Sequence, residues 1–287
     1  MRPSSQTSSR LAVCLNSSFF GFYTHCGFMQ GCEEVGLRPA ALSGASAGAL
    51  VAGFLAAKKS ATETAALLLQ RDIRAMLLDW GVPWRALGTA MNRPGFTGAV
   101  SADVALRMLR AHLGDLRIEA CTEPRFALSV TNLTAGRSEI VTAGPLAEFV
   151  LASGAFPGVF AAREIEGAHY WDGGIANPVP FDPWLTDSAI DTILVHLVFN
   201  PVPPTVRTSP RLLNVTRSFH VCHRIISDEL VRWKTKAACL AGKRLIVLRT
   251  EAPRPHLMTP GRVGPACVAA GLATARANSA LLAALSA

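Results

Sequence analysis

The sequence predicts an α/β fold, with three α/β/α layers and a central, mostly parallel sheet. Apolar, strand-like runs alternate with helical patterns along most of the 287 residues, and such alternation places helices on both faces of a parallel sheet. Half of the residues are hydrophobic and only 17% are charged, which is typical of a globular chain with a sizeable core. One antiparallel element is expected, a hairpin around Thr134-Ala135-Gly136.

Caps and turn residues delimit the expected elements. Gly36 ends the first helix as a typical C-cap residue, and Ser60 with Glu63 forms a capping box. Residues 81–98 are expected to form a loop-rich insertion. Strands are expected at residues 11–15, 40–42, 125–133, 137–142, 164–166, 169–171, 191–199 and 244–249. Helices are expected at residues 23–35, 49–57, 61–71, 102–113, 145–151, 211–240 and 265–284, and a further helix after residue 71 is expected to end at about residue 80.

The chain is expected to comprise a polar N-terminal tail, residues 1–10, and a single α/β domain, residues 11–287. A signal peptide is not predicted, because no apolar region with a cleavage site follows the polar start. No apolar run is long enough to predict a transmembrane segment. We therefore expect a cytoplasmic protein or one peripheral on a membrane.

Charge and cysteine content narrow the function classes. The net charge of +8 favours anionic surfaces, but no Lys/Arg-rich block with interleaved aromatics predicts nucleic-acid binding. The seven cysteines are irregularly spaced and form no C-x-x-C pair, so a zinc site is not expected and a reducing compartment is favoured. No metal, nucleotide or haem motif is present, and no cofactor is predicted. Nothing in the sequence specifies an oligomeric state.

Residues 44–48 (GASAG) have the strand–turn–helix context of a nucleophile elbow. A serine on such a sharp turn exposes its hydroxyl, and Gly44 and Gly48 remove the Cβ atoms that would clash there. The following helix starts at Ser46, so its free N–H groups face a developing oxyanion. The alternative is an ordinary close-packed turn of small residues.

A serine nucleophile needs a base, and none of the seven histidines is a convincing candidate. His196 lies inside a buried-strand pattern. His220 and His223 have basic neighbours on a helix and are expected on a solvated face. His25 is expected to be packed rather than catalytic, His112 lies at a helix end, and His256 lies in a proline-rich loop.

Asp172 is the carboxylate that the pattern singles out. It is followed by Gly173-Gly174, which frees the backbone around it on a turn that can face a cleft. The alternative is an Asx-turn, in which the side chain only accepts from the following N–H groups.

Three motifs in order resemble the patatin-like phospholipase family. They are the G-x-S-x-G at residues 44–48, the segment ASGAFPGVF at 152–160 and the WDGG at 171–174, followed by the N-P-V-P stretch at 177–180. The resemblance extends over nearly the whole chain and implies a patatin-like α/β hydrolase domain. It also implies a Ser–Asp dyad in which Ser46 is the nucleophile and Asp172 the general base, so that no histidine is required.

The loop after the first strand departs from the family pattern. Members show G-G-G-x-R/K-G or G-x-G-F-L-G there, whereas residues 16–21 are NSSFFG, which keep only the F-x-G ending with Gly21. The backbone N–H groups of Ser17, Ser18 and Ala47 are the expected oxyanion donors. Asn and Ser are among the residues that tolerate turn geometry. The alternative is that this loop no longer forms an anion site.

Three functions remain under consideration. The first is a lipid acyl hydrolase of the phospholipase A type that uses an acyl-enzyme on Ser46. The second is a weak or inactive patatin-like protein that binds lipid or protein, because the oxyanion loop lacks its glycines. The third is a histidine-using α/β-hydrolase with the order Ser46, Asp172, His196, which is disfavoured because its elbow usually comes later in the chain.

The expected partner is a phospholipid or other lipid ester, presented at a peripheral membrane surface. Residues 81–98 contain Trp84, Met91 and Phe96, and residues 217–233 mix aromatic, aliphatic and basic side chains. Such a composition suits a membrane surface. The alternative for 217–233 is an amphipathic helix with its apolar face in the core.

Overall fold

The computed structural model of the chain describes residues 10–70, 81–199, 201, 215–253, 255 and 262–286. Most of the expected N-terminal tail, the helix expected up to residue 80, the first residues of the helix expected at 211–240 and the loop with His256 lie outside these ranges.

A mixed, mostly parallel sheet forms the centre of the molecule, as the sequence predicts. Its strand order is β10-β9-β1-β2-β4-β8-β7, with β5 paired to β4. The pairs among β10, β9, β1, β2 and β4 are parallel, and those among β4, β5, β7 and β8 are antiparallel. The strands are β1 (Leu11–Leu15), β2 (Ala41–Gly44), β4 (Arg125–Asn132), β5 (Arg137–Val141), β7 (Arg163–Ile165), β8 (Ala168–Asp172), β9 (Thr192–Phe199) and β10 (Arg244–Glu251).

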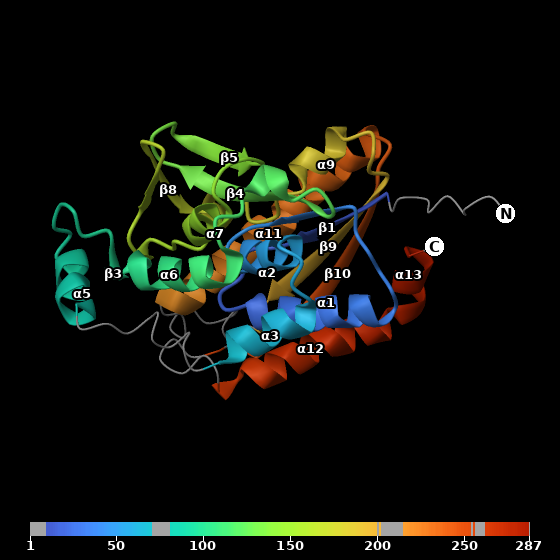
Figure 1. Cartoon of the computed structure of the whole chain (residues 1–287), viewed down its shortest axis with the longest axis horizontal. Helices are drawn as coiled ribbons and strands as arrows, with labels where there is room; N and C mark the ends of the chain where they lie inside the picture. Colours follow the sequence, from blue (N-terminus) through green and yellow to red (C-terminus); the bar gives the residue numbers. More distant parts are fainter. Residues whose placement is uncertain are drawn as a thin grey trace.

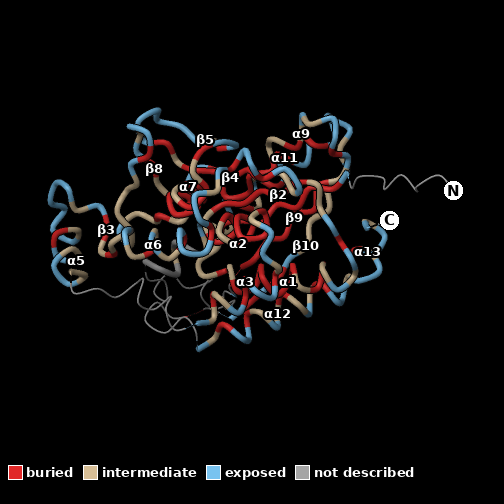
Figure 2. Tube along the Cα trace, viewed as in Figure 1, coloured by how far each residue is buried: buried red, intermediate tan, exposed pale blue. Residues whose placement is uncertain are grey.

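Strands β1, β2 and β9 are buried on both faces of the sheet, which explains their largely apolar sequences. In β1, Leu11, Val13 and Leu15 belong to the core on one face of the sheet. Ala12 and Cys14 belong to the core on the other face. This alternation is the period-two pattern of a strand, and Figure 2 shows the buried trace running through the strands.

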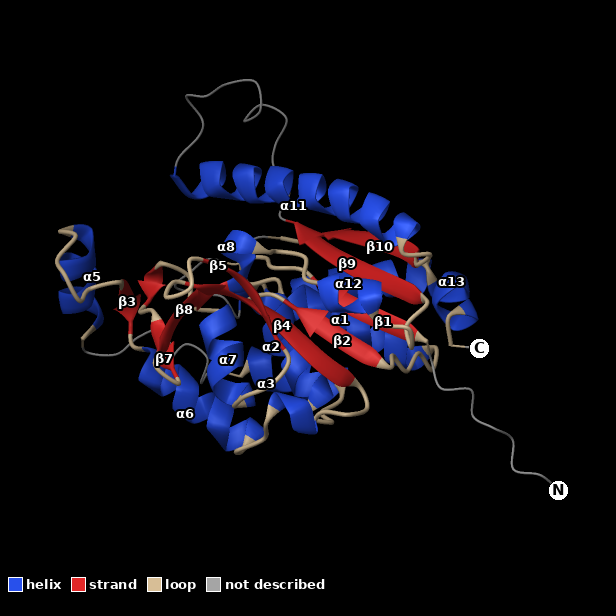
Figure 3. Cartoon of the chain, turned by 90° about the horizontal axis from the view of Figure 1, so that it is seen from above, coloured by secondary structure: helices blue, strands red, loops and turns tan. Residues whose placement is uncertain are grey.

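Helices cover both faces of this sheet. Figure 1 shows α1, α3 and α12 stacked on one side, and Figure 3 shows the long α11 along the other, beside β9 and β10. The helices are α1 (Phe22–Glu34), α2 (Ala47–Ala56), α3 (Ala61–Leu69), α5 (Val82–Ala90), α6 (Ala102–Leu113), α7 (Leu146–Ser153), α8 (Gly173–Ala176), α9 (Asp182–Thr186), α11 (Val215–Leu240), α12 (Gly264–Ala277) and α13 (Ser279–Ala284), with a 3-10 turn at Ile118–Ala120. None of the helices in the described ranges has both the length and the apolarity to cross a bilayer.

Helices α1 and α12 approach each other closely through glycine. A Cβ atom at Gly27 would lie 1.9 Å from the carbonyl oxygen of Val268, and one at Gly271 would lie 2.0 Å from that of Thr24. Both distances are too short for any side chain, so the two glycines allow backbone-to-backbone contact between the helix nearest the N-terminus and the one near the C-terminus.

Residues 81–98 are the main correction to the sequence prediction. They contain a regular helix, α5, and lead into β3 (Gly98–Val100), which pairs with β6 (Gly158–Phe160) in a separate two-stranded sheet. Pro83 misled the prediction because proline is compatible with the first turn of a helix, where its missing N–H is not needed. The predicted final helix is also divided, at Asn278, into α12 and α13.

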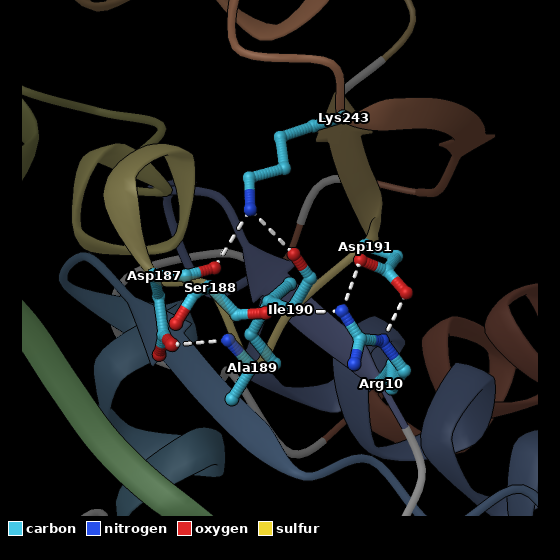
Figure 4. A network of polar contacts seen from close by, with 7 residues as sticks. All are labelled: Arg10, Asp187, Ser188, Ala189, Ile190, Asp191 and Lys243. Atoms are coloured by element: carbon cyan, nitrogen blue, oxygen red, sulfur yellow. Dashed lines mark hydrogen bonds and ion pairs between the residues drawn. The ribbon is translucent and has the colours of Figure 1, made fainter.

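Polar side chains hold the turn that leads into β9, at the end of the sheet where β1 and β9 begin (Figure 4). Lys243 Nζ donates to the carbonyl oxygens of Asp187 (2.7 Å) and Ile190 (2.6 Å). Arg10 pairs with Asp191 and donates to the Ser188 carbonyl (3.0 Å). This end of the sheet is therefore fixed by charged side chains, whereas the opposite end carries the candidate site.

Candidate active site

Ser46 lies on a sharp turn between the carboxyl end of β2 and the start of α2. Its φ and ψ angles are 52° and −117°, a conformation that is uncommon for a residue with a side chain. The flanking glycines make the turn sterically feasible. A Cβ atom at Gly44 would lie 2.4 Å from the carbonyl carbon of Gly48, and one at Gly48 would lie 2.1 Å from the carbonyl oxygen of Leu15.

The structure brings Ser46 and Asp172 together from positions 126 residues apart in the sequence. Ser46 Oγ donates to Asp172 Oδ2 at 2.7 Å, and the Gly174 N–H donates to Asp172 Oδ1 at 2.6 Å. The second contact is the local bond of an Asx-turn. Both interpretations of Asp172 are therefore compatible, because one carboxylate oxygen closes the turn and the other faces the serine.

Burial determines the protonation of Asp172. The residue is 3% exposed, and desolvation raises the pKa of its carboxyl group to about 7, although the hydrogen bonds from Ser46 and Gly174 lower it. A carboxylate with this pKa is a much stronger base than an exposed aspartate.

Backbone contacts fix the end of β8 that carries Asp172. Its N–H donates to the Ala155 carbonyl (3.0 Å), and its carbonyl accepts from Thr131 Oγ1 (2.8 Å). The next residue must be glycine, since a Cβ atom at Gly173 would lie 2.0 Å from the Ser129 carbonyl oxygen.

Ser153, at the end of α7, is a residue of the site to which sequence reasoning assigned no role. Its Oγ accepts from the Ser46 N–H (2.9 Å) and donates to the Ser129 carbonyl (2.8 Å). It thus braces the elbow against β4. The only signal in the sequence was its place in the A-S-x-x-x-P segment.

Lys234, on α11, holds the turn after Asp172 and was also missed. Its Nζ donates to Asn177 Oδ1 (2.9 Å), to the Val179 carbonyl (2.7 Å) and to Asp182 Oδ2 (2.7 Å). These three acceptors use all three protons of the ammonium group. A lysine on a helix gives no sequence signal for this, because its partners lie more than 50 residues away.

The loop between β1 and α1 corrects one of the three expected oxyanion donors. The N–H of Ser17 donates to the Pro178 carbonyl at 2.8 Å, so it is not free to bind an oxyanion. Within the described residues, the N–H groups of Ser18 and Ala47 donate no hydrogen bond. Both residues line the same cavity as Ser46 and Asp172.

Two glycines shape this loop. A Cβ atom at Gly174 would lie 1.9 Å from Ser17 Oγ, and one at Gly21 would lie 1.7 Å from Ser18 Oγ. The first contact places the serine loop directly against the turn that carries Asp172.

A cavity of about 170 Å³ opens beside Ser46 and Asp172. Apart from the serines, Asp172 and His223, its walls are almost entirely apolar, and they include Phe19, Phe22, Met108, Leu109, Val150 and Phe160. Among the described residues, no cluster of three or more His, Cys, Asp or Glu side chains could hold a metal ion.

Comparison with known proteins assigns the family. A model of the patatin-like phospholipase family matches residues 13–185, which include the elbow, the Ser153 segment and the Asp172 turn. The chain belongs to the patatin-like phospholipase family.

Two relatives of this patatin-like chain have names that refer to NTE. An uncharacterized NTE family protein of Mycobacterium bovis is 32% identical over 214 residues, or 74% of this chain. The chain spans 56% of that relative's length. Lysophospholipase NTE1 of Cryptococcus neoformans is 29% identical over 174 residues, which are 61% of this chain and 10% of the fungal protein.

A solved structure supports the fold of this patatin-like chain. The crystal structure of VipD from Legionella pneumophila superimposes with a TM-score of 0.51 at 16% identity. The match covers 96% of this chain and 66% of VipD.

Two histidines of this patatin-like protein are buried in its core. His25 and His196 are fully buried, as predicted, and hydrogen-bond to each other (2.9 Å) away from the cavity. His196 is thus not placed to act on Ser46, which contradicts the histidine-using α/β-hydrolase.

His223 corrects the prediction of a solvated face. It lines the cavity, its Nε2 is shielded from solvent, and burial lowers its pKa to about 4. The basic neighbours in the sequence were misleading because successive residues of a helix point in different directions. The side chain of His220 lies outside the described residues.

Proposed function

We propose that this protein is a lipid acyl hydrolase in which Ser46 is the nucleophile and Asp172 the general base. The observation that carries the proposal is the 2.7 Å hydrogen bond from Ser46 Oγ to Asp172 Oδ2 at the wall of an apolar cavity. The conformation of Ser46 supports it, because strained backbone of this kind concentrates at functional sites.

In the first half-reaction, Ser46 Oγ attacks the ester carbonyl carbon and its proton passes to Asp172 Oδ2. The carbonyl oxygen becomes an oxyanion, which the N–H groups of Ser18 and Ala47 and the start of α2 stabilise. The tetrahedral intermediate then collapses, the C–O bond to the alcohol breaks, and Asp172 gives the proton to the leaving alcohol. The product is an acyl ester on Ser46.

In the second half-reaction, water attacks the acyl carbon while Asp172 accepts one of its protons. Collapse of this second intermediate breaks the bond to Ser46 Oγ, which recovers the proton from Asp172. The carboxylic acid leaves, and the free enzyme is regenerated with no net change in Ser46 or Asp172.

The cavity supports a lipid ester as the substrate class. Apolar cavities of roughly 150 Å³ bind a molecule as large as benzene, so a cavity of about 170 Å³ accepts an acyl segment of comparable size. Its walls provide no cationic group among the described residues, which favours the acyl chain over a phosphate head group as its occupant.

The second candidate function, a lipid-binding protein with little activity, is favoured by one observation. Ser17 N–H is bonded to Pro178 and leaves two candidate donors. Loss of one oxyanion donor costs about 10²–10³-fold in rate in other enzymes, so the two functions differ in measurable activity.

Labelling with a fluorophosphonate probe distinguishes them. We expect the wild type to react with the probe and to hydrolyse 4-nitrophenyl hexanoate, and Ser46→Ala to do neither. Asp172→Asn should lose about 10²-fold or more in kcat, which is the usual contribution of a general base. Ser60→Ala, which changes the cap of α3 and no residue of the cavity wall, should match the wild type.

An unlabelled, inactive wild type would support the binding protein instead. Full activity in Asp172→Asn would refute the role of Asp172 while leaving Ser46 as the nucleophile.

We further propose that α5 carries the membrane contact. Trp84, Leu87 and Met91 are 66%, 50% and 57% exposed, and their spacing places them on one face of the helix. Figure 1 shows α5 standing apart from the main sheet. It adjoins β3, whose partner β6 contributes Phe160 to the cavity wall, so one pair of strands links α5 to the site.

Vesicle binding tests this surface. We expect the double variant Trp84→Ala, Leu87→Ala to bind vesicles of mixed neutral and anionic phospholipid at least tenfold more weakly. Burying a large apolar side chain is worth about 1.5–3 kcal/mol, and 1.4 kcal/mol is a factor of ten. Hydrolysis of the soluble short-chain ester should not change.

The matched control is Trp233→Ala, which removes a tryptophan that is 64% exposed on α11. If Trp233→Ala weakened vesicle binding and the α5 variant did not, the contact would lie on α11 and the proposal for α5 would be wrong.

A further inference from the structure

We propose that a buried chain of hydrogen bonds, from Thr250 through His196 and His25 to Asn16, positions the N–H of Ser18 as an oxyanion donor. The inference rests on the proposed function. It names residues that act through the backbone of the loop between β1 and α1 and that do not themselves touch the substrate.

The chain crosses three elements of the core. Thr250 Oγ1, on β10, lies 2.9 Å from His196 Nε2 on β9. His196 Nδ1 lies 2.9 Å from His25 Nδ1 on α1, and His25 Nε2 lies 3.0 Å from the carbonyl oxygen of Asn16. His196 also stacks on Phe28, with 3.8 Å between ring centroids.

The acceptor at one end fixes the direction of every bond. Because the Asn16 carbonyl can only accept, His25 must carry its proton on Nε2. Burial lowers the pKa of His25 to about 4 and that of His196 well below its usual value, so both rings are neutral at pH 7. His25 Nδ1 is then an acceptor, and His196 must donate from Nδ1. Its Nε2 is the acceptor left for the Thr250 hydroxyl, which also lies 2.8 Å from Thr274 Oγ1.

Asn16 links this chain of hydrogen bonds to the loop between β1 and α1. Its N–H donates to the His196 carbonyl (3.2 Å), and its Oδ1 accepts from the Val198 N–H (2.8 Å). Its Nδ2 donates to the Ser17 carbonyl at 2.8 Å. Every polar group of Asn16 therefore has a partner, and the residue is a fixed base for the two serines that follow it.

Because the peptide bond is planar, the orientation of the Ser17 carbonyl fixes that of the Ser18 N–H. In a trans peptide, the C=O of one residue and the N–H of the next point in opposite directions. The Ser17 carbonyl is held by Asn16, so the Ser18 N–H points away from Asn16. It belongs to a residue that lines the cavity beside Ser46. The polar chain thus replaces the glycines that shape this loop in the family pattern.

Two threonine variants test the inference. Thr250→Val keeps the shape but removes the donor to His196, and Thr250→Ser keeps the hydroxyl. We expect Thr250→Val to lower kcat about tenfold with KM within twofold of the wild type, and Thr250→Ser to retain most of the activity. A merely structural role of Thr250 would not separate kcat from KM in this way.

Thr64→Val is the matched control. It removes a buried hydroxyl that donates to the Ser60 carbonyl at 2.8 Å in α3, outside the proposed chain. We expect it to lower thermal stability with kcat unchanged. Equal kcat values for Thr250→Val and wild type, with the wild type active, would overturn the inference and leave the hydrolase intact.

A spectroscopic measurement on the wild type needs no variant to fold. Long-range ¹H–¹⁵N correlation spectra at pH 7 should show His25 protonated on Nε2 only and His196 protonated on Nδ1 only. The opposite tautomers, or a charged ring, would overturn the chain whether or not the protein is active. An inactive, unlabelled wild type would instead refute the proposed function, and the positioning role with it.

Discussion

The carboxyl group of Asp172 is buried beside a neutral hydroxyl and a backbone N–H, and among the described residues it forms no ion pair. Its ionised form is therefore costly in the folded protein and freely solvated in the unfolded chain. Under the proposed mechanism, this same ionised form is the base. Activity and stability should consequently respond to pH in opposite directions.

The activity limb follows directly from the proposed base. Asp172 must be ionised to accept the proton of Ser46, and burial raises its pKa to about 7. We expect kcat for a soluble ester to rise with pH through about 7 and then level off. A pH profile that is flat between pH 5 and pH 8 would contradict the assignment of Asp172 as the base.

The stability limb has the opposite sign. The pKa of Asp172 is about 7 in the folded protein, and its usual value is 3.8. The contribution of its neutral carboxyl group to folding stability is therefore fully present below pH 3.8 and is lost as pH rises through 7. Asp172→Asn has no such loss. Urea unfolding should therefore show the variant gaining on wild type by about 4 kcal/mol between pH 4 and pH 8, at 1.36 kcal/mol per pKa unit. Parallel stability curves would contradict the raised pKa.

At the level of single residues, the sequence identified the two that meet but not those that hold them. Ser46 and Asp172 have motif glycines close to them in the sequence, and such local patterns can be recognised without a structure. Ser153 and Lys234 act on partners far along the chain, and such contacts depend on how strands and helices pack. The Ser17 N–H shows the same limitation, since its partner is Pro178.

Among the elements, the pair formed by α1 and α12 depends on glycine. A Cβ atom at Gly27 would lie 1.9 Å from a backbone oxygen of α12, which cannot move without the helix. A Cβ atom at Gly53 would meet side chains alone: a methyl group of Val150 at 2.8 Å, and Leu146 and Phe126 at 3.7 Å. Both glycines are inside helices, where alanine itself is favoured by about 1 kcal/mol.

We therefore expect the same substitution to have different effects at these two positions. Gly27→Ala should lower the free energy of unfolding by about 1–3 kcal/mol through overpacking, while Gly53→Ala should be close to neutral. Urea denaturation of both variants provides the measurement. Equal midpoints for Gly27→Ala and the wild type would mean that the helices separate at no cost.

Most helices and strands were predictable because their apolar periods and caps are local. The capping box of Ser60 and Glu63 is formed as predicted, and the hairpin of β4 and β5 closes as expected. The small sheet of β3 and β6 was not predictable, since each strand has three residues and becomes a strand only through its distant partner. Helix α5 was obscured by Pro83 and Gly88.

On the scale of the whole molecule, one end of the sheet is held by polar contacts and the other carries the candidate site. Charged side chains brace the end where β1 and β9 begin, as Figure 4 shows. The candidate site lies where β1 and β2 end, which is the usual position for ligands in open α/β sheets. The fold class was predictable because it follows from the alternation of strands and helices, whereas the order of the strands required the structure.

The contact between α1 and α12 has a consequence for biosynthesis. Thr250 and the helix that packs on α1 are translated more than 200 residues after the loop with Ser17 and Ser18. At about 5–20 residues per second, the delay is on the order of 10–50 s. A nascent chain thus carries its serine elbow before the parts that anchor the neighbouring loop exist, and the site is complete only after Thr250 and α12 have been translated.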